Sequence, residues 1–295
     1  MTTPTTMTIA LISDVFYENL PAERLRARLE EAKSHGAELA VLPELACNPW
    51  SPATRQARED DAESPGGPRF LMQAEAAREV GIGLVAGVIL KDPKSGDRRN
   101  TAVVFNSRGE LIALYAKNHL PEEPGFWETS HYVPGEYAPS RIDGFTMPVG
   151  VQICSDINRP EGSHLLGAQG VEAILAPRAT EMATYGRWRP VFIANALTST
   201  AYVLSVNRPN PEEGVLIGGP SIAVAPNGTI VLETTDALGI VTLDRAVVEA
   251  ARPAYPGYLP VRAQQYAEAW SRIAQDQSVP AMPIFEMQAA SNARR

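Results

Sequence analysis

Residues 147–177 read MPVGVQICSDINRPEGSHLLGAQGVEAILAP. The apolar run 147–154 predicts a strand, 160–170 predicts a helix that ends at its glycine, and 171–177 predicts a second strand. This order is typical of a parallel sheet covered by helices. The stretch therefore indicates an α/β fold, and it places Cys154 at the end of a buried strand.

The same alternation of helices and buried strands extends outward from this stretch in both directions. Each half of the chain has strand-helix-strand units followed by a hairpin, with turns at 106–109 and at Asn227–Gly228. We therefore expect two similar halves packed together. The other predicted elements are helices at 22–36, 68–81 and 187–200, strands at 7–15, 38–44, 82–90, 201–207 and 239–244, and hairpins at 101–117 and 220–234.

The domain organisation follows from the absence of any low-complexity block or linker. We expect one domain over residues 7–251. Residues 252–295 are rich in Pro, Tyr, Gln and Ala, which predicts an extension that packs on another surface.

Composition narrows the class of protein. Of 295 residues, 44% are apolar and 20% charged, so a substantial core is expected. The net charge is −8 and no Lys/Arg-dense stripe occurs, which argues against a nucleic-acid partner. The apolar stretches are too short to span a membrane, and the first residues do not resemble a signal peptide. Two cysteines in so long a chain fit a reducing compartment, so we expect a cytoplasmic protein.

Cys154 is the first candidate for chemistry. A side chain at the end of such a strand projects from the carboxyl edge of the sheet, where α/β proteins bind ligands. The N-terminus of the following helix and a nearby cation would lower the pKa of the thiol and favour the nucleophilic thiolate. The alternative is a small buried hydrophobe, which is the commoner fate of a free cysteine. Cys47 is interpreted in that second way, as packing.

Three more ionisable side chains follow the ends of predicted strands or lie in an aromatic-rich loop. Glu44 in AVLPELACNP has the character of a general base, and Lys117 in ALYAKNHLP that of an oxyanion donor. Glu128 lies in the loop PGFWETSHYVPG, which could cover a pocket. Taken singly, each is more often a solvated or snorkelling charge. Together with Cys154 they form an ordered series.

This series resembles the nitrilase superfamily of carbon–nitrogen hydrolases. VLPEL, YAKNHLP, GFWETSHYVPGE and GVQICSDINRPE are similar to that family's glutamate, lysine, second-glutamate and cysteine motifs, and SVNR and GGPSIAVAPNGTIV to its downstream strands. The similarity runs from about Met7 to about Asp244.

The resemblance implies a four-layer α-β-β-α sandwich that forms a homodimer or a higher homo-oligomer, with the C-terminal extension crossing to the partner. It implies Cys154 as the nucleophile, Glu44 as the general base, and Lys117 with the backbone N–H of Ser155 as the oxyanion hole. Glu128 would position the substrate or assist proton transfer. The implied reaction hydrolyses a small-molecule substrate through a thioester and needs no metal or organic cofactor.

The residues around the cysteine bear on the branch of the family. Cys154-Ser155-Asp156, with a Pro-Glu pair soon after, is more similar to the amidases and carbamoylases than to true nitrilases, which carry tryptophan and glutamate after the cysteine. Ile157 and Asn158 stand where hydrolases of N-carbamoyl-D-amino acids carry paired arginines, which argues against that substrate. A linear amide or another N-carbamoyl compound is therefore expected.

Three other readings stay open. A nitrilase would use the same residues on a nitrile. A binding module on this fold would carry out no reaction. A structural protein would hold Cys154 as an unreactive core thiol.

The substrate pocket is predicted from the loop at 176–188 and from Trp127. Arg178 and Glu181 are unusual residues in a segment that lines the acyl pocket in the family. Arg178 would suit a substrate carboxylate and Glu181 a cationic end, while an internal ion pair between the two is the alternative.

Overall fold

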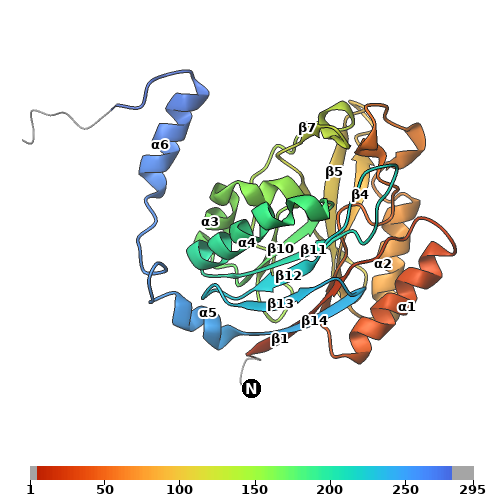
Figure 1. Ribbon diagram of the computed structural model, residues 1–295, viewed down its shortest axis with the longest axis horizontal. Helices are drawn as coiled ribbons and strands as arrows, with labels where there is room; N and C mark the ends of the chain where they lie inside the picture. Colours follow the sequence, from red (N-terminus) through yellow and green to blue (C-terminus); the bar gives the residue numbers. More distant parts are fainter. Residues whose placement is uncertain (1–4, 281–295) are drawn as a thin grey trace, which may run out of the picture. The chain divides into compact units, whose positions relative to one another are not determined.

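Two β-sheets lie face to face between two layers of helices in the computed structural model, which describes residues 5–280 (Figure 1). Helices α1 and α2 cover one sheet, and α3 and α4 cover the other. The expected four-layer α-β-β-α sandwich is confirmed. The helices are α1 (Pro21–Ser34), α2 (Pro68–Val80), α3 (Pro160–Ala168), α4 (Tyr185–Ser199), α5 (Arg245–Ala251) and α6 (Ala263–Ala274).

Each sheet is built from one half of the sequence, except that one strand of the second half, β14, joins the first sheet. Within residues 5–280, one sheet has the order β14-β1-β2-β4-β5-β6, with β3 paired to β4, and the other has the order β13-β12-β11-β10-β9. A separate hairpin joins β7 and β8. The strands are β1 (Thr6–Ile12), β2 (Leu39–Val41), β3 (Ala62–Glu63), β4 (Gly83–Lys91), β5 (Arg98–Phe105), β6 (Leu111–Ala116), β7 (Glu122–Glu123), β8 (Phe126–Trp127), β9 (Val149–Val151), β10 (Ala173–Arg178), β11 (Tyr202–Asn207), β12 (Ser221–Val224), β13 (Ile230–Thr234) and β14 (Leu238–Asp244).

Strand β14 crosses from the second half to the first sheet. It pairs antiparallel with β1 from Thr6↔Asp244 to Ile12↔Leu238. The sequence predicts a strand at 239–244 without saying which sheet it joins, because the pairing partner lies more than 220 residues away. This pairing ties the end of the sandwich to its beginning.

Apolar side chains fill the three spaces between the four layers. Alternation along β1 shows how: Ile9 and Leu11 face the second sheet, whereas Ala10 and Ile12 face α1 and α2. A third cluster fills the space between the second sheet and α3 and α4. Because both faces of each sheet are covered, the central strands read as continuous apolar runs rather than alternating ones.

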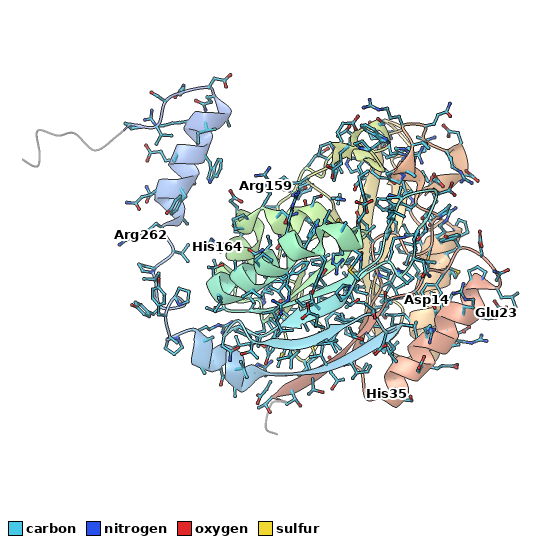
Figure 2. All side chains as sticks on the ribbon, viewed as in Figure 1. Asp14, Glu23, His35, Arg159, His164 and Arg262 are labelled. Atoms are coloured by element: carbon cyan, nitrogen blue, oxygen red, sulfur yellow. The ribbon has the colours of Figure 1, made fainter. Side chains whose placement is uncertain are left out.

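Helix α1 shows the local rules at work. Leu25 and Leu29 lie one turn apart and are fully buried against the first sheet. On the polar side, Asp14 forms ion pairs with Arg24 (2.8 Å) and Arg28 (3.1 Å). Figure 2 labels Asp14 beside this helix. The loop after β1 is thereby fixed to the helix that follows it.

The chain divides into two compact units between Tyr258 and Leu259. The second unit contains α6, on which the side chains of Tyr266, Trp270 and Ile273 are all more than half exposed. The expected extension 252–295 includes residues 281–295, which lie outside the described residues. No helix among the residues described is long and apolar enough to cross a membrane.

Three strands end three residues earlier than the sequence predicts. The segment 7–15 forms β1 over Thr6–Ile12. The segment 38–44 forms β2 over Leu39–Val41, and 147–154 forms β9 over Val149–Val151. In the segments 38–44 and 147–154 the chain leaves the sheet before it reaches the ionisable residue. Glu44 and Cys154 therefore lie in tight turns rather than on strands. Among residues 5–280, five short 3₁₀ helices occupy turns and loops: η1 (Ser51–Ala53), η2 (Glu59–Asp61), η3 (Glu128–Ser130), η4 (Cys154–Asn158) and η5 (Met182–Thr184).

Candidate active site

Glu44, Lys117, Glu128 and Cys154 come together at the carboxyl edge of the two sheets. The Lys117 ammonium Nζ donates to Glu44 Oε1 at 2.7 Å and to Glu128 Oε1 at 2.5 Å. The side chains of Lys117 and both glutamates are at most 1% exposed. The charges of all three act on the Cys154 thiol, which is itself buried. The four residues singled out in the sequence therefore form one sealed cluster.

Glu44 is held by partners from both sheets. Asn100 on β5 donates from Nδ2 to Glu44 Oε1 at 2.7 Å. Arg208, just after β11, donates from Nη1 to the carbonyl oxygens of Glu44 and Leu45, both at 2.9 Å. Glu212 balances the Arg208 charge, with a shortest separation of 2.5 Å. These contacts fix the turn that presents the Glu44 carboxylate.

The turn at Glu44 also needs room against the sheet. Leu45 has a positive φ of 49°, which is uncommon for a residue with a side chain. A Cβ added to Gly87 of β4 would lie 3.0 Å from the Leu45 backbone nitrogen. Glycine at position 87 therefore allows the turn to approach the strand closely.

Cys154 lies at a sharp turn between β9 and the following helices. Its φ is +47°, and η4 begins at this residue. The Sγ atom is 3.8 Å from the carbonyl oxygen of Ala179. Strained backbone of this kind persists only when surrounding contacts impose it, and it is frequent at functional sites.

The thiol pKa of Cys154 is raised, so the expected lowering is wrong. Burial is the main cause, the Glu44 carboxylate adds to it, and the Lys117 ammonium opposes it without cancelling it. The residue therefore rests as a thiol at neutral pH. A nucleophilic role then requires a base that removes its proton during the reaction.

Burial and neighbouring charges shift the pKa values of both Lys117 and Glu128. Burial alone would lower the pKa of Lys117, but the carboxylates of Glu128 and Glu44 outweigh it and raise the pKa well above the usual value. Burial raises the pKa of Glu128 to about 8, although Lys117 pulls it down. Lys117 therefore keeps its ammonium charge inside the buried cluster, and Glu128 holds its proton at neutral pH.

Each glutamate keeps one oxygen free. Glu44 Oε2 and Glu128 Oε2 are buried and have no hydrogen-bond partner among the described residues. The Tyr132 hydroxyl is likewise buried without a partner among the described residues. Burial is the main cause of the raised pKa of Tyr132, and the nearby Glu128 carboxylate adds to it. Such groups are costly unless something else binds to them. The free carboxyl oxygens of Glu44 and Glu128 can accept a proton from a bound molecule or donate one to it.

Two other predicted site residues, Ser155 and Trp127, are the chain neighbours of Cys154 and Glu128. The Ser155 hydroxyl donates to the carbonyl oxygen of His119. Trp127 on β8 carries the Arg55 guanidinium 3.9 Å from its ring centroid.

Arg178 and Glu181 do not form the internal ion pair that was one alternative. Arg178 is fully buried and donates to Ser205 Oγ (2.9 Å), to Thr180 Oγ1 (2.6 Å) and to the carbonyl oxygen of Pro220. Burial lowers its pKa to about 10. The Glu181 carboxylate, half-buried, has no ion pair or hydrogen bond among the described residues.

Sequence reasoning gave no role to Asn100, Arg208 or Asp156. Arg208 stands in SVNR, one of the motifs quoted above, and Asp156 follows Cys154 by two residues. Asn100 has no such signal, because a single asparagine early in a strand does not reveal which face it occupies.

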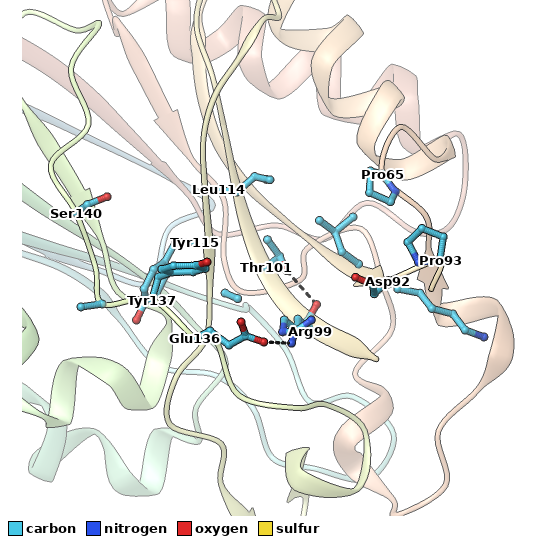
Figure 3. Close-up of a pocket in the computed structure, with 14 residues that line it drawn as sticks. Pro65, Asp92, Pro93, Arg99, Thr101, Leu114, Tyr115, Glu136, Tyr137 and Ser140 are labelled. Carbon is cyan, nitrogen blue, oxygen red and sulfur yellow. Dashed lines mark hydrogen bonds and ion pairs between the residues drawn. The ribbon is translucent and has the colours of Figure 1, made fainter. Parts of the chain in front are cut away.

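One surface cavity lies apart from the four clustered residues. It has a volume of about 600 Å³ and is bordered by β4, β5 and β6 and by the loop at 136–140. Figure 3 shows its lining, with Arg99 paired to Glu136 at 2.7 Å and Tyr115 at one side. None of the four clustered residues lines it. Among residues 5–280, no group of three or more His, Cys, Asp or Glu side chains is placed to hold a metal ion.

Comparison with known proteins gives a consistent match. Residues 22–253 match the family described as carbon–nitrogen hydrolase. A nitrilase from Pyrococcus abyssi is 31% identical over 78% of this chain and 85% of its own length. An omega-amidase from Saccharomyces cerevisiae is 32% identical over 74% of this chain and 79% of its own length. The crystal structure of Saccharomyces cerevisiae Nit3, of the nitrilase superfamily, superposes with a TM-score of 0.77 at 27% identity, covering 88% of this chain and 96% of that one.

Proposed function

The chain belongs to the carbon–nitrogen hydrolase family and is an enzyme of that class, and from this premise we propose that it hydrolyses a linear amide or N-carbamoyl group through a thioester on Cys154. The observation that carries the proposal is the sealed cluster in which the Lys117 ammonium is held between Glu44 and Glu128 beside the thiol. Its groups supply a nucleophile, a base and an oxyanion donor within one small space.

In the first half of the reaction, Glu44 takes the Cys154 proton as the sulfur attacks the amide carbon. The Lys117 ammonium and the Ser155 backbone N–H stabilise the negative oxygen that forms. Glu44 then gives the proton to the nitrogen, the C–N bond breaks, and ammonia or an amine leaves. The free Oε2 of Glu44 can hold this proton without giving up the bond to Lys117.

In the second half, water attacks the thioester while Glu44 takes one of its protons. The tetrahedral adduct collapses to a carboxylic acid, and the proton returns to the Cys154 sulfur. One difficult hydrolysis thus becomes two easier steps. Glu128, protonated at neutral pH, keeps the charge around Lys117 balanced and positions the substrate through its free Oε2.

The distal end of the substrate is proposed from Arg178 and Glu181. All three nitrogens of the Arg178 guanidinium already donate to neutral oxygens, whereas the Glu181 carboxylate is unpaired. We therefore favour a substrate with a cationic or hydrogen-bond-donating end. Glu181→Gln should lower kcat/KM about tenfold for a primary amide with a distal ammonium, and not for its carboxylate counterpart. If the enzyme instead prefers the substrate with a distal carboxylate, Arg178 rather than Glu181 would bind the distal end. Trp127, directly before Glu128, stays a proposed wall of the same pocket.

A substrate panel tests the reaction itself. Ammonia release would be followed from a primary amide, an N-carbamoyl amine, an N-carbamoyl amino acid and a nitrile, each with wild type and Cys154→Ala. Release from the amide or a carbamoyl compound that requires Cys154 supports the proposal. Release from the nitrile alone would make the enzyme a nitrilase with the same nucleophile. Silence across the panel, with an unreactive Cys154, would favour the binding-module reading.

We further propose that the chain works as a cytoplasmic homodimer, or a higher homo-oligomer, in which the extension 252–295 packs on the partner. The exposed Tyr266, Trp270 and Ile273 of α6 support this, because such an apolar face is rarely left in water. Two free cysteines fit a reducing compartment. Sedimentation of the full chain and of a variant truncated after Tyr258 would test the assembly. A full chain that sediments as a monomer would contradict it.

A further inference from the structure

The Asp156 carboxylate joins the two segments that carry the catalytic cysteine and lysine. It is 1% exposed. Its Oδ1 accepts from the backbone N–H groups of Asn118 (3.2 Å) and His119 (2.9 Å) and from Nδ1 of the His119 ring (2.8 Å). Its Oδ2 accepts from the Tyr115 hydroxyl (2.9 Å) and the Ile153 backbone N–H (3.2 Å). Both oxygens thus act as hydrogen-bond acceptors.

These five donors come from two different sheets. Tyr115 lies near the end of β6 in the first sheet, and Asn118 directly follows Lys117. Ile153 directly precedes Cys154, beyond the end of β9 in the second sheet. The carboxylate therefore fixes the backbone beside the lysine to the backbone beside the cysteine.

The position of this link matters because the oxyanion hole is divided between the sheets. Under the function proposed above, the Lys117 ammonium comes from the first sheet and the Ser155 N–H from the second. Both must reach the same oxygen at about 2.7–3.1 Å. A relative shift of about 1 Å between the segments is enough to lower the rate about a hundredfold.

We propose that Asp156 is a positioning residue that sets the separation of Lys117 and Cys154 and thereby assembles the oxyanion hole. It does so without touching the substrate. The inference rests on the proposed function, and it assigns the aspartate of the Cys-Ser-Asp sequence a task distinct from both nucleophile and base.

Asp156→Asn is the principal test. The amide keeps the size of the carboxylate but places an NH2 group against backbone or hydroxyl donors, so at least one side of the link is lost. We expect kcat for the cleaved amide to fall about a hundredfold, with KM unchanged, because oxyanion contacts act in the transition state. Alkylation of Cys154 by iodoacetamide forms no oxyanion and should slow far less than kcat. Asp143→Asn, which alters an exposed aspartate paired with Arg141, is the matched control and should match wild type.

If Asp156→Asn does not fold, substitutions that each remove a single donor to the carboxylate keep the test decisive. Tyr115→Phe removes one of the two donors to Oδ2, and His119→Ala removes the ring donor to Oδ1. Each should lower kcat severalfold at constant KM, and the double variant should lower it further. A folded Asp156→Asn, or the folded double variant, with wild-type kcat would overturn the inference. So would a loss of kcat no larger than the loss of alkylation rate.

The two proposals fail in different ways. If Cys154→Ala still hydrolyses the amide, the proposed function is wrong whatever Asp156 does. If Cys154→Ala is inactive while Asp156→Asn keeps its kcat, the function stands and the positioning role is wrong.

Discussion

Cys154 and Cys47 are both buried, and burial is the main cause of a raised thiol pKa at each. They differ in what surrounds the sulfur. Cys47 belongs to the apolar layer between the first sheet and its helices, and its pKa is about 12. Cys154 lies at a turn with φ of +47°, beside the cluster of Glu44, Lys117 and Glu128. Burial and a raised pKa therefore do not distinguish the two thiols. The difference is the cluster of Glu44, Lys117 and Glu128 beside Cys154, which supports our proposal that Cys154 is the nucleophile.

Replacing each cysteine in turn should give the largest difference between the two positions. Cys154→Ala should lower kcat by about 10³-fold or more, because it removes the atom that forms the thioester. Cys47→Ala should keep wild-type kcat and lose only packing energy, about 1–2 kcal/mol. Ammonia release and urea denaturation of both variants measure these effects. Comparable losses of kcat in the two would remove the distinction.

The cations beside the two thiols give the next largest contrast. Lys117 acts on Cys154, and Arg69 acts on Cys47. Lys117→Met should lower kcat about 10²–10³-fold, as expected for loss of an oxyanion donor. Arg69→Met should leave kcat unchanged. Steady-state kinetics on folded protein decides the matter, and an active Lys117→Met would contradict the proposed oxyanion hole.

The carboxylates beside Cys154 predict a pH dependence of stability. The Glu128 pKa is raised from 4.5 to about 8 in the folded chain. Below pH 4.5 the group is protonated in both states, so its contribution is fully present. As pH rises from about 5 to 8 only the unfolded chain releases the proton, and the free energy of unfolding falls by up to about 1.4 kcal/mol per pH unit.

Glu128→Gln isolates this effect, because the amide does not titrate. Urea denaturation of wild type and the variant at several pH values should show a difference in slope confined to pH 5–8. Parallel stability curves for the two proteins would mean that Glu128 is already ionised in the folded state.

The carboxylate beside Cys47 should have the smallest effect. Glu63 accepts from the backbone N–H groups of Arg69 (3.0 Å) and Phe70 (2.7 Å) at the start of α2. Glu63→Gln keeps one acceptor and loses the charge that favours a helix N-terminus, so we expect a loss of about 1 kcal/mol. Thermal denaturation should show a Tm lower by about 2 °C, with kcat unchanged. A marked loss of kcat would show that this region is coupled to the active site.

Much of the fold follows from local sequence pattern. The glycine and proline boundaries predict α1, α2 and α3 closely, and the turns at 106–109 and Asn227–Gly228 predict both hairpins. Local pattern does not reveal that β14 joins β1, since that pairing links the two ends of the sandwich. It also misses the short hairpin of β7 and β8, whose strands have two residues each.

The residues of the site are also predictable only in part. Glu44, Lys117, Glu128 and Cys154 are predicted because each carries chemistry at a recognisable place in the sequence. The supporting contacts of Asn100, Arg208 and Asp156 depend on which strands become neighbours, and a single sequence does not contain that information. The expected lowering of the Cys154 pKa is wrong because burial, together with the Glu44 carboxylate, outweighs the Lys117 ammonium.

Capture of the thioester is the measurement that tests the central claim most directly. Wild-type enzyme would be mixed with the amide it hydrolyses, quenched in acid within one turnover, digested, and examined by mass spectrometry. We predict that the peptide containing Cys154 gains the mass of the amide less that of ammonia, that the peptide containing Cys47 is unchanged, and that hydroxylamine releases the adduct as a hydroxamate. An enzyme that turns over with no adduct under these conditions, or with the adduct on another residue, would contradict the account.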